Sequence, residues 1–315
     1  MKKHRFSRRR FVGSAMATVA AVKALDLGQP RARAAERLHL TGNVYPWLTF
    51  YQREGKDFNA DLDAGLGQVA AAGLDGFEPI INTPADIDRL VPLLKKHGLE
   101  MRSFYVNSTL HEPDAADESI ARIVALAEKA RAAGTRIIVT NPNPIRWGGP
   151  EAKNDTQLRT QAKAMERLGG ALKDRGLTLA YHFHGAELEH AARELHHMMV
   201  GTDPRRVTLC LDAHWVYRGA GDSEVAVFDI TRLYGRRISE LHLRQSQGGI
   251  WQEAFDGQGD IDYAKLVTIL AGMNVKPHLV LEQAIEDKTP KTMTPLEAHR
   301  RGAIAARQVL APLTP

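Results

Sequence analysis

The chain has 315 residues, of which 43% are hydrophobic and 25% are charged, and its formal net charge is +5. This composition is ordinary for a folded globular protein, and it excludes wholesale disorder and a collagen-like repeat. The single cysteine, Cys210, excludes a framework of internal disulfides.

The positive charge is concentrated at the N-terminus. Residues 1–34 contain nine of the 42 basic side chains and one of the 37 acidic ones. The rest of the chain has 33 basic and 36 acidic residues, a formal charge of −3. The excess of basic residues therefore lies in the first segment. The net negative charge of the remaining residues predicts no nucleic-acid-binding surface on them.

The first 34 residues have the features of an export signal. A basic region precedes a short, weakly apolar stretch at 11–22, and Ala32-Arg33-Ala34 has the small-x-small pattern of a cleavage site. The segment Ser7-Arg8-Arg9-Arg10-Phe11-Val12-Gly13 resembles the twin-arginine export signal, with Gly13 in place of its usual lysine. The apolar stretch is shorter than the about 20 residues that a membrane-spanning helix needs, so we expect no stable membrane anchor.

This resemblance implies a partner and a location. The partner is the twin-arginine translocation machinery, which exports folded proteins, and the location is periplasmic or otherwise exported. Export after folding suits a protein that acquires a metal or cofactor in the cytoplasm, and a lone cysteine is compatible with it. The alternative for residues 1–34 is a disordered basic arm, and the mature protein is predicted to span 35–315.

From residue 38 onward, short apolar runs typical of strands alternate with amphipathic segments typical of helices. The predicted strands are 43–50, 76–80, 101–106, 136–140, 177–183, 207–211, 238–243 and 278–281. The predicted helices are 62–72, 84–97, 119–133, 157–175, 188–199, 222–234, 263–273 and 295–310. The first four of these helices are followed by glycines that suit a left-handed helix stop, namely Gly73, Gly98, Gly134 and Gly176.

Strands that alternate with helices predict parallel βα units in an α/β protein. Eight such units after residue 38 match a single (β/α)8 TIM barrel in number and size. A doubly wound open sheet is the alternative, but no Gly-x-Gly-x-x-Gly or phosphate-binding loop follows a predicted strand. In a barrel the functional residues lie at the C-terminal ends of the strands, so the strand positions also predict the site.

Four consecutive predicted strands end in polar residues that face the mouth of such a barrel. In Tyr181-His182-Phe183-His184 the strand period of two places both imidazoles on one face. The next three strands end near Asp212, His242 and Glu282. Two carboxylates buried together without a cation would be costly, and nitrogen with oxygen donors suits Mn²⁺, Co²⁺, Zn²⁺ or Fe²⁺. We therefore predict one divalent metal ion here; the alternative for each residue alone is a satisfied buried polar group.

At these positions the chain resembles the xylose-isomerase-like barrel superfamily of sugar isomerases, epimerases and related endonucleases. The resemblance is carried by Gly76-Phe77-Glu78, Tyr181-His182-Phe183-His184, Leu211-Asp212-Ala213-His214-Trp215, Leu241-His242-Leu243-Arg244, Gly257-Gln258-Gly259-Asp260-Ile261-Asp262 and Leu281-Glu282. In that superfamily Glu, Asp, His and Glu from strands five to eight usually hold the metal. Asp212, His242 and Glu282 match the last three, and a histidine, either His182 or His184 with His182 favoured, replaces the first.

The resemblance implies a metal-dependent sugar isomerase or epimerase that abstracts a proton next to a carbonyl. Only one glutamate remains of the pair that exchanges protons in ketose epimerases, so the alternative is a lyase or hydratase acting on a 3-keto-sugar or glycoside-derived compound. We assign Glu282 as the base, His184 as the acid or a substrate ligand, and Arg244 to stabilising an enediolate oxygen. Arg244-Gln245 stands where the superfamily usually has Lys-Asp.

Other residues near the strand ends are candidates for binding a small-molecule carbohydrate. Glu78, Asn107 and Asn141 end strands two to four and can bond hydroxyl groups, although capping or loop anchoring suits the asparagines equally well. Trp47 and Trp215 can stack on the apolar face of a sugar, and core packing is the alternative for each. No phosphate loop is visible and export is predicted, so we expect an unphosphorylated substrate.

Two other function classes stay open. The endonuclease branch of the superfamily needs a larger metal-ligand set and a basic cleft, and the mature charge of −3 argues against it. A non-catalytic sugar-binding barrel is the other class. The sequence leaves open the exact substrate, the metal and the oligomeric state, with an oligomer possible. Cys210 lies two residues before Asp212, and we expect it to fill the barrel interior.

Overall fold

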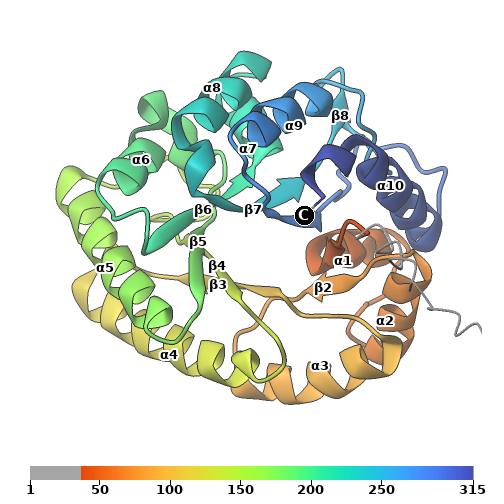
Figure 1. The fold of residues 1–315 in the computed structure, drawn as a ribbon, viewed down its shortest axis with the longest axis horizontal. Helices are drawn as coiled ribbons and strands as arrows, with labels where there is room; N and C mark the ends of the chain where they lie inside the picture. The colour runs from red at the N-terminus through yellow and green to blue at the C-terminus, as the bar shows by residue number, and fades with distance from the viewer. Residues whose placement is uncertain (1–36, 315) are drawn as a thin grey trace, which may run out of the picture. The chain divides into compact units, whose positions relative to one another are not determined.

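The computed structural model describes residues 37–314, and the predicted signal peptide at 1–34 lies outside them. Within these residues, eight parallel strands form a sheet in the order β2-β1-β10-β7-β6-β5-β4-β3. Their bounds are β1 Leu40–Asn43, β2 Gly76–Glu78, β3 Ser103–Ser108, β4 Ile137–Pro142, β5 Thr178–Tyr181, β6 Val207–Asp212, β7 Ile238–Leu243 and β10 His278–Leu281. Figure 1 shows the helices arranged around these strands.

The helices connect successive strands and cover the outside of the sheet. They are α1 Val44–Arg53, α2 Leu62–Ala71, α3 Pro84–His97, α4 Pro113–Arg131, α5 Asp155–Lys173, α6 Glu189–Val200, α7 Ala213–Gly219, α8 Glu224–Tyr234, α9 Tyr263–Gly272 and α10 Pro295–Val309. Short 3₁₀ turns lie at η1 Ala186–Leu188, η2 Gly235–Arg237 and η3 Ala311–Leu313, and an antiparallel pair, β8 Ser246–Gln247 and β9 Ile250–Trp251, follows β7. None of the described helices combines the length and the apolar character that crossing a bilayer requires.

The ring of strands is nearly closed between β2 and β3, the two ends of the strand order. Isolated bridges join Gly76 to Glu100 and Ile80 to Tyr105. The Tyr105 N–H donates to the Pro79 carbonyl at 2.9 Å, which continues the parallel pairing across the gap. Eight parallel strands with helices outside form the predicted (β/α)8 barrel, and the doubly wound alternative is wrong.

The first predicted strand, 43–50, is wrong. Strand β1 ends at Asn43, whose side chain accepts the Tyr45 N–H at 2.7 Å and so caps helix α1. The β-branched and aromatic residues in this run favour a strand by composition. The helix instead buries Val44, Trp47 and Phe50 at a spacing of three residues, which matches one helical face packed on the core.

The four predicted glycine stops are confirmed. The φ angles are 84° at Gly73, 68° at Gly98, 104° at Gly134 and 73° at Gly176. Positive φ is costly for residues with a Cβ atom, so glycine is the residue that ends a helix in this conformation. Helices α2 to α5 therefore end close to the positions that the sequence indicates.

The predicted alternation of side chains along residues 181–183, from the last residue of β5 into the segment after it, is also confirmed. Tyr181 and Phe183 are fully buried in the main hydrophobic core, and the intervening His182 belongs to the barrel interior. Val139, Ala180 and Cys210 form a separate small apolar cluster on three neighbouring strands. Cys210 is a buried free thiol, as expected for a residue that fills the interior.

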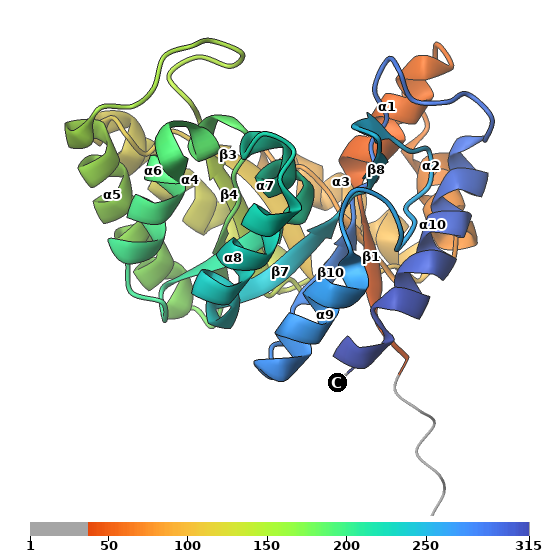
Figure 2. The same cartoon turned by 90° about the horizontal axis from the view of Figure 1, so that it is seen from above.

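The loops after the strands gather on one side of the barrel. Figure 2 shows α1, the loop between β4 and α5, and β8 on this side, with the C-terminus of the chain on the other. These three segments follow β1, β4 and β7. The arrangement forms a mouth at the C-terminal ends of the strands, the place where barrel enzymes have their active sites.

Candidate metal centre

Four buried side chains from neighbouring strands meet at the mouth of the barrel. They are His182 just after β5, Asp212 at the end of β6, His242 on β7 and Glu282 just after β10. One nitrogen or oxygen of each lies within 4.8 Å of the others. The parallel register places Asp212 directly opposite His242, so the sheet itself brings these donors together.

Unpartnered polar atoms in this cluster fit a bound cation. Asp212 Oδ2 and both ring nitrogens of His182 are buried and have no hydrogen-bond partner. The 3.9 Å from His182 Nε2 to Asp212 Oδ2 is too long for a hydrogen bond. A divalent cation would satisfy these atoms, and their donor types suit Mn²⁺, Co²⁺, Zn²⁺ or Fe²⁺. His184 is not among the converging donors, so the geometry favours His182 as the fourth ligand.

Asp212 is also the N-cap of helix α7. Its Oδ1 accepts the N–H groups of His214 and Trp215, both at 2.9 Å. Burial alone would raise the pKa of the Asp212 carboxyl, but Arg244 together with the imidazoles of His182 and His242 holds the pKa well below its usual range. The carboxylate therefore stays ionised, with one oxygen on the helix and the other free for a cation.

Two further buried glutamates contact His242 from inside the barrel. His242 Nε2 lies 3.0 Å from Glu240 Oε1 and 3.2 Å from Glu78 Oε1, while Nδ1 lies 2.7 Å from Glu282 Oε2. When Nε2–H donates to these glutamates, the Nδ1 lone pair is directed at the cluster, which is the usual support of a metal-bound histidine. Sequence reasoning missed Glu240, whose signal was its place two residues before His242 on the same face of β7.

The environment of the two glutamates keeps one charged and the other neutral. Burial raises the pKa of Glu240 well above its usual range, and the charge of Glu78 adds to this effect. Burial opposes ionisation of Glu78 as well, but in the metal-free protein the positive charge of protonated His242 and a hydrogen bond from Ser103 lower its pKa. Asn43 Nδ2 also donates to Glu78 at 2.7 Å. Glu78 is fully buried and does not line the cavity, contrary to its predicted role in substrate binding.

We expect Glu240→Leu to weaken metal binding by about 10–100-fold, because leucine has no oxygen to accept Nε2–H of His242. Titration of the metal-free protein with Co²⁺, followed by its absorption spectrum, measures the dissociation constant. Glu253→Leu is the matched control, since Glu253 is similarly buried but pairs with Arg53 elsewhere. An unchanged Co²⁺ affinity in Glu240→Leu would show that Glu240 does not position His242.

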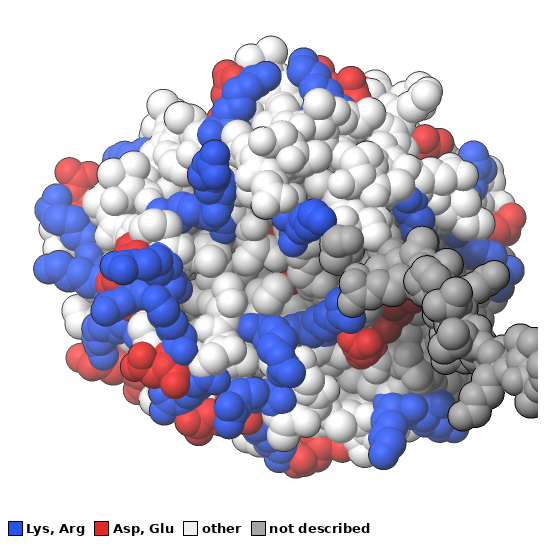
Figure 3. Space-filling model, in the orientation of Figure 1, with Lys and Arg blue, Asp and Glu red and all other residues white. Residues whose placement is uncertain are grey.

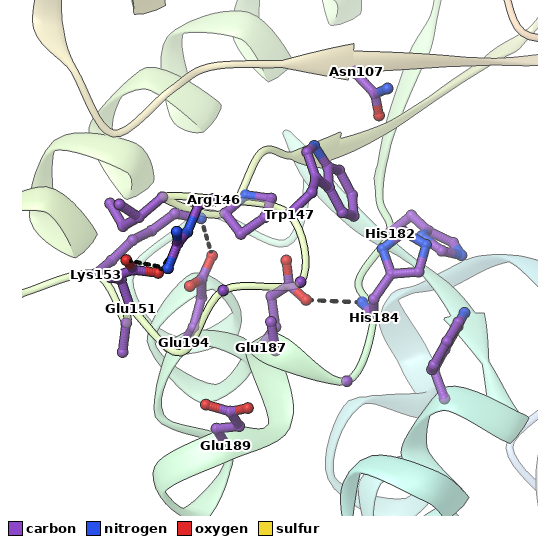
Figure 4. Close-up of a pocket in the computed structure, with 18 of the residues that line it drawn as sticks. Asn107, Arg146, Trp147, Glu151, Lys153, His182, His184, Glu187, Glu189 and Glu194 are labelled. Atoms are coloured by element: carbon purple, nitrogen blue, oxygen red, sulfur yellow. Dashed lines mark hydrogen bonds and ion pairs between the residues drawn. The ribbon is translucent and has the colours of Figure 1, made fainter.

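A cavity of about 690 Å³ opens above this cluster. Its inner wall is formed by residues at the strand ends, including His182, His184, Arg244 and Glu282. The loop after β4 and the segment after β5 form its outer wall, and Figure 4 shows side chains of both, including Arg146, Trp147, Glu151, Lys153, Glu187, Glu189 and Glu194. The candidate ligands thus adjoin a space that is open to small molecules.

A hydrogen-bond chain defines the tautomer of His184. Asn141 Nδ2 donates to the His182 carbonyl at 3.2 Å and to Glu187 Oε1 at 3.0 Å. Asn141 Oδ1 must then accept from His184 Nδ1, which lies 2.8 Å away, so His184 Nε2 keeps a free lone pair. Burial lowers the pKa of His184 well below its usual range, which keeps the imidazole neutral. Asn141 therefore acts on His184 and does not itself line the cavity, contrary to its prediction as a substrate contact.

Arg244 lies buried between the cluster and two tryptophan rings. Its guanidinium carbon is 4.2 Å from the ring centre of Trp251 and 5.6 Å from that of Trp215. Nη2 pairs with Glu282 Oε1 at 3.1 Å and Nε donates to the Glu282 carbonyl at 3.0 Å. Nη1 is buried without a partner, so a donor remains for an oxygen that becomes negative in the cavity.

Of the other residues predicted to bind substrate, two line the cavity and one lies in the hydrophobic core. Asn107 and Trp215 line the cavity, and Asn107 Oδ1 is buried without a partner. Trp47 is fully buried and stacks on His299, with 3.9 Å between the ring centroids. The prediction for Trp47 is contradicted because it assumed a strand over 43–50, whereas helix α1 turns this ring into the core.

A His–Ser–Asp chain beside the cluster has a structural role. His214 Nε2 lies 2.8 Å from Ser246 Oγ, which donates to Asp260 Oδ2 at 2.6 Å. In a nucleophilic triad the aspartate would contact the histidine, whereas here it contacts the serine. Both His214 and Ser246 are fully buried. The chain links α7 to the β8–β9 pair, which carries Trp251, and so holds the wall behind Arg244 in place.

Figure 3 shows the side of the barrel opposite the mouth, where basic and acidic side chains are interspersed. In the cavity wall, Arg146 pairs with Glu151 and Lys153 with Glu194, each at 2.7 Å. Recognition of a phosphate backbone relies on basic groups that are free to replace its counterions. These features favour a small neutral ligand over a nucleic acid.

The barrel fold is shared with a known family of proteins. The chain belongs to the xylose isomerase-like TIM barrel family, which matches residues 66–306. An inosose dehydratase of Clostridium perfringens is 25% identical over 273 residues, covering 78% of this chain and 87% of the relative. The solved structure of an L-ribulose 3-epimerase has a TM-score of 0.64 at 19% identity, covering 88% of this chain and 95% of that one. The 3-keto-D-glucoside 4-epimerase of E. coli has a TM-score of 0.59 at 15% identity, covering 88% and 99%. All three are enzymes.

Proposed function

We propose that the protein is a divalent-metal-dependent enzyme of the sugar isomerase/epimerase type. It abstracts a proton next to the carbonyl of an unphosphorylated sugar or keto-sugar. The observation that carries this proposal is the buried donor set of two histidines, an aspartate and a glutamate beside a cavity that also contains His184 and Arg244. A metal held by His182, Asp212, His242 and Glu282 supplies Lewis acidity to a carbonyl and its neighbouring hydroxyl.

His184 and Arg244 contribute the acid–base and electrostatic part of this chemistry. His184 Nε2 accepts the proton from the carbon, because Asn141 holds the other ring nitrogen as a donor. Arg244 Nη1 bonds the oxygen on which negative charge develops. Glu282, assigned as the base from the sequence, lies between His242 and Arg244 and serves as ligand and second proton-transfer group.

The charges around the centre suit an anionic intermediate. Arg244 pairs with Glu282, and it would lie beside a divalent cation held by Asp212 and Glu282, so two sources of positive charge adjoin the cavity. Removing a proton from the substrate carbon creates one negative charge at this place. Preorganised positive charge lowers the cost of that step, since the groups need not reorganise as the charge forms.

A lyase is the second candidate function. It is favoured because the two proton-transfer groups, His184 and Glu282, differ in chemical type. An epimerase returns the proton to the opposite face of the carbon, for which two similar bases are well suited. Here the pair is an imidazole and a metal-binding carboxylate. In a dehydration, the C–H electron pair first forms an enolate with the carbonyl carbon. As the carbonyl re-forms, this pair makes the double bond to the neighbouring carbon while the C–O bond of that carbon breaks, and the hydroxyl leaves with the transferred proton as water. The inosose dehydratase relative supports this outcome.

The outer cavity supports an unphosphorylated substrate. Arg146 and Lys153 face the cavity, but each is neutralised by a glutamate at 2.7 Å. Phosphate sites ordinarily present guanidinium, ammonium or helix N-terminal donors to the phosphate itself. A neutral hydroxylated ligand needs no such free charge.

We expect the purified protein to bind close to one divalent ion per chain and to exchange one carbon-bound hydrogen of a keto-sugar with solvent. The test is a screen of Mn²⁺-, Co²⁺- and Zn²⁺-loaded protein against ketoses, aldoses and 3-keto-sugars in deuterated water, read by NMR and mass spectrometry. Deuterium retained in a substrate isomer identifies an isomerase or epimerase, and loss of water identifies a lyase. Lack of near-stoichiometric metal would contradict the proposal, and sugar binding without exchange would identify a non-catalytic sugar-binding barrel.

We also propose that the protein is exported through the twin-arginine translocation machinery. The pattern from Ser7 to Gly13 and the excess of basic residues before Ala34 support this location. Fractionation of cells that express the full chain, beside its Arg8→Lys/Arg9→Lys variant, tests it. Retention of the unaltered chain in the cytoplasm would contradict the proposed export.

A further inference from the structure

The cavity extends well beyond the candidate metal centre. Its volume of about 690 Å³ lies within the roughly 300–1,000 Å³ typical of cavities that enclose drug-sized ligands. A single sugar ring is much smaller than such a ligand. His182, Glu282, His184 and Arg244 line only the inner part, so a one-ring substrate would leave the outer part to water.

Three large apolar side chains are exposed at the outer part of this cavity. Tyr45 is 46% exposed, Ile145 39% and Trp147 55%, and all three belong to the cavity lining. Tyr45 follows β1, whereas Ile145 and Trp147 follow β4, and these strands are not neighbours in the barrel. Apolar side chains that converge on a concave site from separate segments of the chain mark a surface that a ligand covers.

Trp147 connects this outer part with the reaction centre. Its ring centroid lies 5.5 Å from that of His184, and the two rings are nearly perpendicular at 78°. Figure 4 shows the indole projecting into the cavity from the loop after β4, near His184. A perpendicular contact covers at most one face of the indole, so a broad apolar face stays available for stacking.

The arginine and lysine side chains of the outer part already have partners. Arg146 pairs with Glu151 and Lys153 with Glu194, each at 2.7 Å, and Arg193 Nη2 donates to the Lys153 carbonyl at 2.6 Å. An anionic substituent would have to compete with these pairs for the basic groups. The outer part is therefore better suited to a neutral group with an apolar face.

We propose that the outer part of the cavity is a subsite for a second, neutral ring joined to the reacting sugar, so that the substrate is a glycoside. Trp147 stacks on the second ring, and Tyr45 and Ile145 cover its sides. The inference rests on the proposed function, which places the reacting sugar at the metal centre. A second sugar and an aromatic aglycone share the required chemistry, a neutral ring with an apolar face.

Binding to the metal-loaded protein tests this subsite without turnover. The probes are methyl and phenyl glucosides of both anomers, with maltose and cellobiose, and calorimetry measures their dissociation constants. We expect at least one phenyl glucoside or disaccharide to bind about tenfold more tightly than the methyl glucosides. Which of the two classes binds identifies the source of the second ring. We expect Trp147→Ala to remove most of this difference, with methyl glucoside affinity unchanged, and Trp147→Phe to keep most of it.

Leu233→Ala is the matched control, since Leu233 is 65% exposed on α8 and does not line the cavity. It should leave every affinity unchanged. If the two-ring probes bind no more tightly than methyl glucosides, or if Trp147→Ala weakens both equally, the subsite is wrong while the proposed function stands. If no probe binds and no keto-sugar exchanges its proton with solvent, the proposed function fails and the subsite fails with it.

Discussion

Asp212→Asn is expected to remove the bound metal and to lower kcat/KM by at least about a thousandfold. The amide keeps an oxygen that can accept the N–H groups of His214 and Trp215, so helix α7 stays capped. What is lost is the negative charge of the unpartnered Oδ2, which the structure presents to the cluster. Metal content by mass spectrometry, kcat/KM and the thermal unfolding temperature separate loss of the centre from loss of the fold.

The matched control for this variant is Asp61→Asn. Asp61 is the N-cap of α2 and accepts the Ala64 N–H at 3.0 Å, away from the candidate centre. The same substitution there should leave metal content and kcat/KM unchanged. Retention of one metal ion and full activity by Asp212→Asn would show that Asp212 is not a ligand.

His184→Gln is expected to lower kcat by about 10²–10⁴-fold while the metal stays bound. Glutamine can still donate a hydrogen bond to Asn141 Oδ1, but it offers no basic nitrogen in place of Nε2. The donor cluster includes His182 and not His184, so metal content should not fall. Steady-state kinetics and metal analysis of the same preparation measure the two effects separately.

His97→Gln is the control for this second variant. His97 lies on α3 and contacts Asp63 on α2, in the helical layer outside the barrel. It should keep both kcat and metal. Loss of metal from His184→Gln would show that His184 is the fourth ligand, and unchanged kcat would show that another group takes the proton. Either result would overturn the assignment of His184 as the resting proton acceptor.

Local patterns were sufficient to predict most of the fold. Glycines with positive φ end the helices α2 to α5, and the alternation along residues 181–184 separates core rings from interior imidazoles. Both signals depend on neighbours in the chain, so they are visible without tertiary structure. The strand predicted over 43–50 failed because composition favours a strand there, whereas the Asn43 cap and core packing select helix α1.

For the candidate site, the sequence predicted the strand-end donors but not the residues that contact and orient them. Asp212, His242 and Glu282 each lie at or near the end of a strand, and a parallel barrel brings such positions to one edge. The contact of Glu240 and Glu78 with His242 depends on the depth of each strand in the barrel, which a single strand does not reveal. The same holds for Asn141, which contacts His184 from strand β4 across to the segment after β5.

By itself, then, the sequence determined the barrel, the charge distribution along the chain and the strand-end donors, because each follows from residue type and local periodicity. The tertiary structure alone decided that His182 and not His184 lies among the converging donors, that Trp47 belongs to the core and that Trp147 faces the cavity. These outcomes depend on distances between segments far apart in the chain. Such distances are set by how helices and loops pack around the strands, which residue order does not show directly.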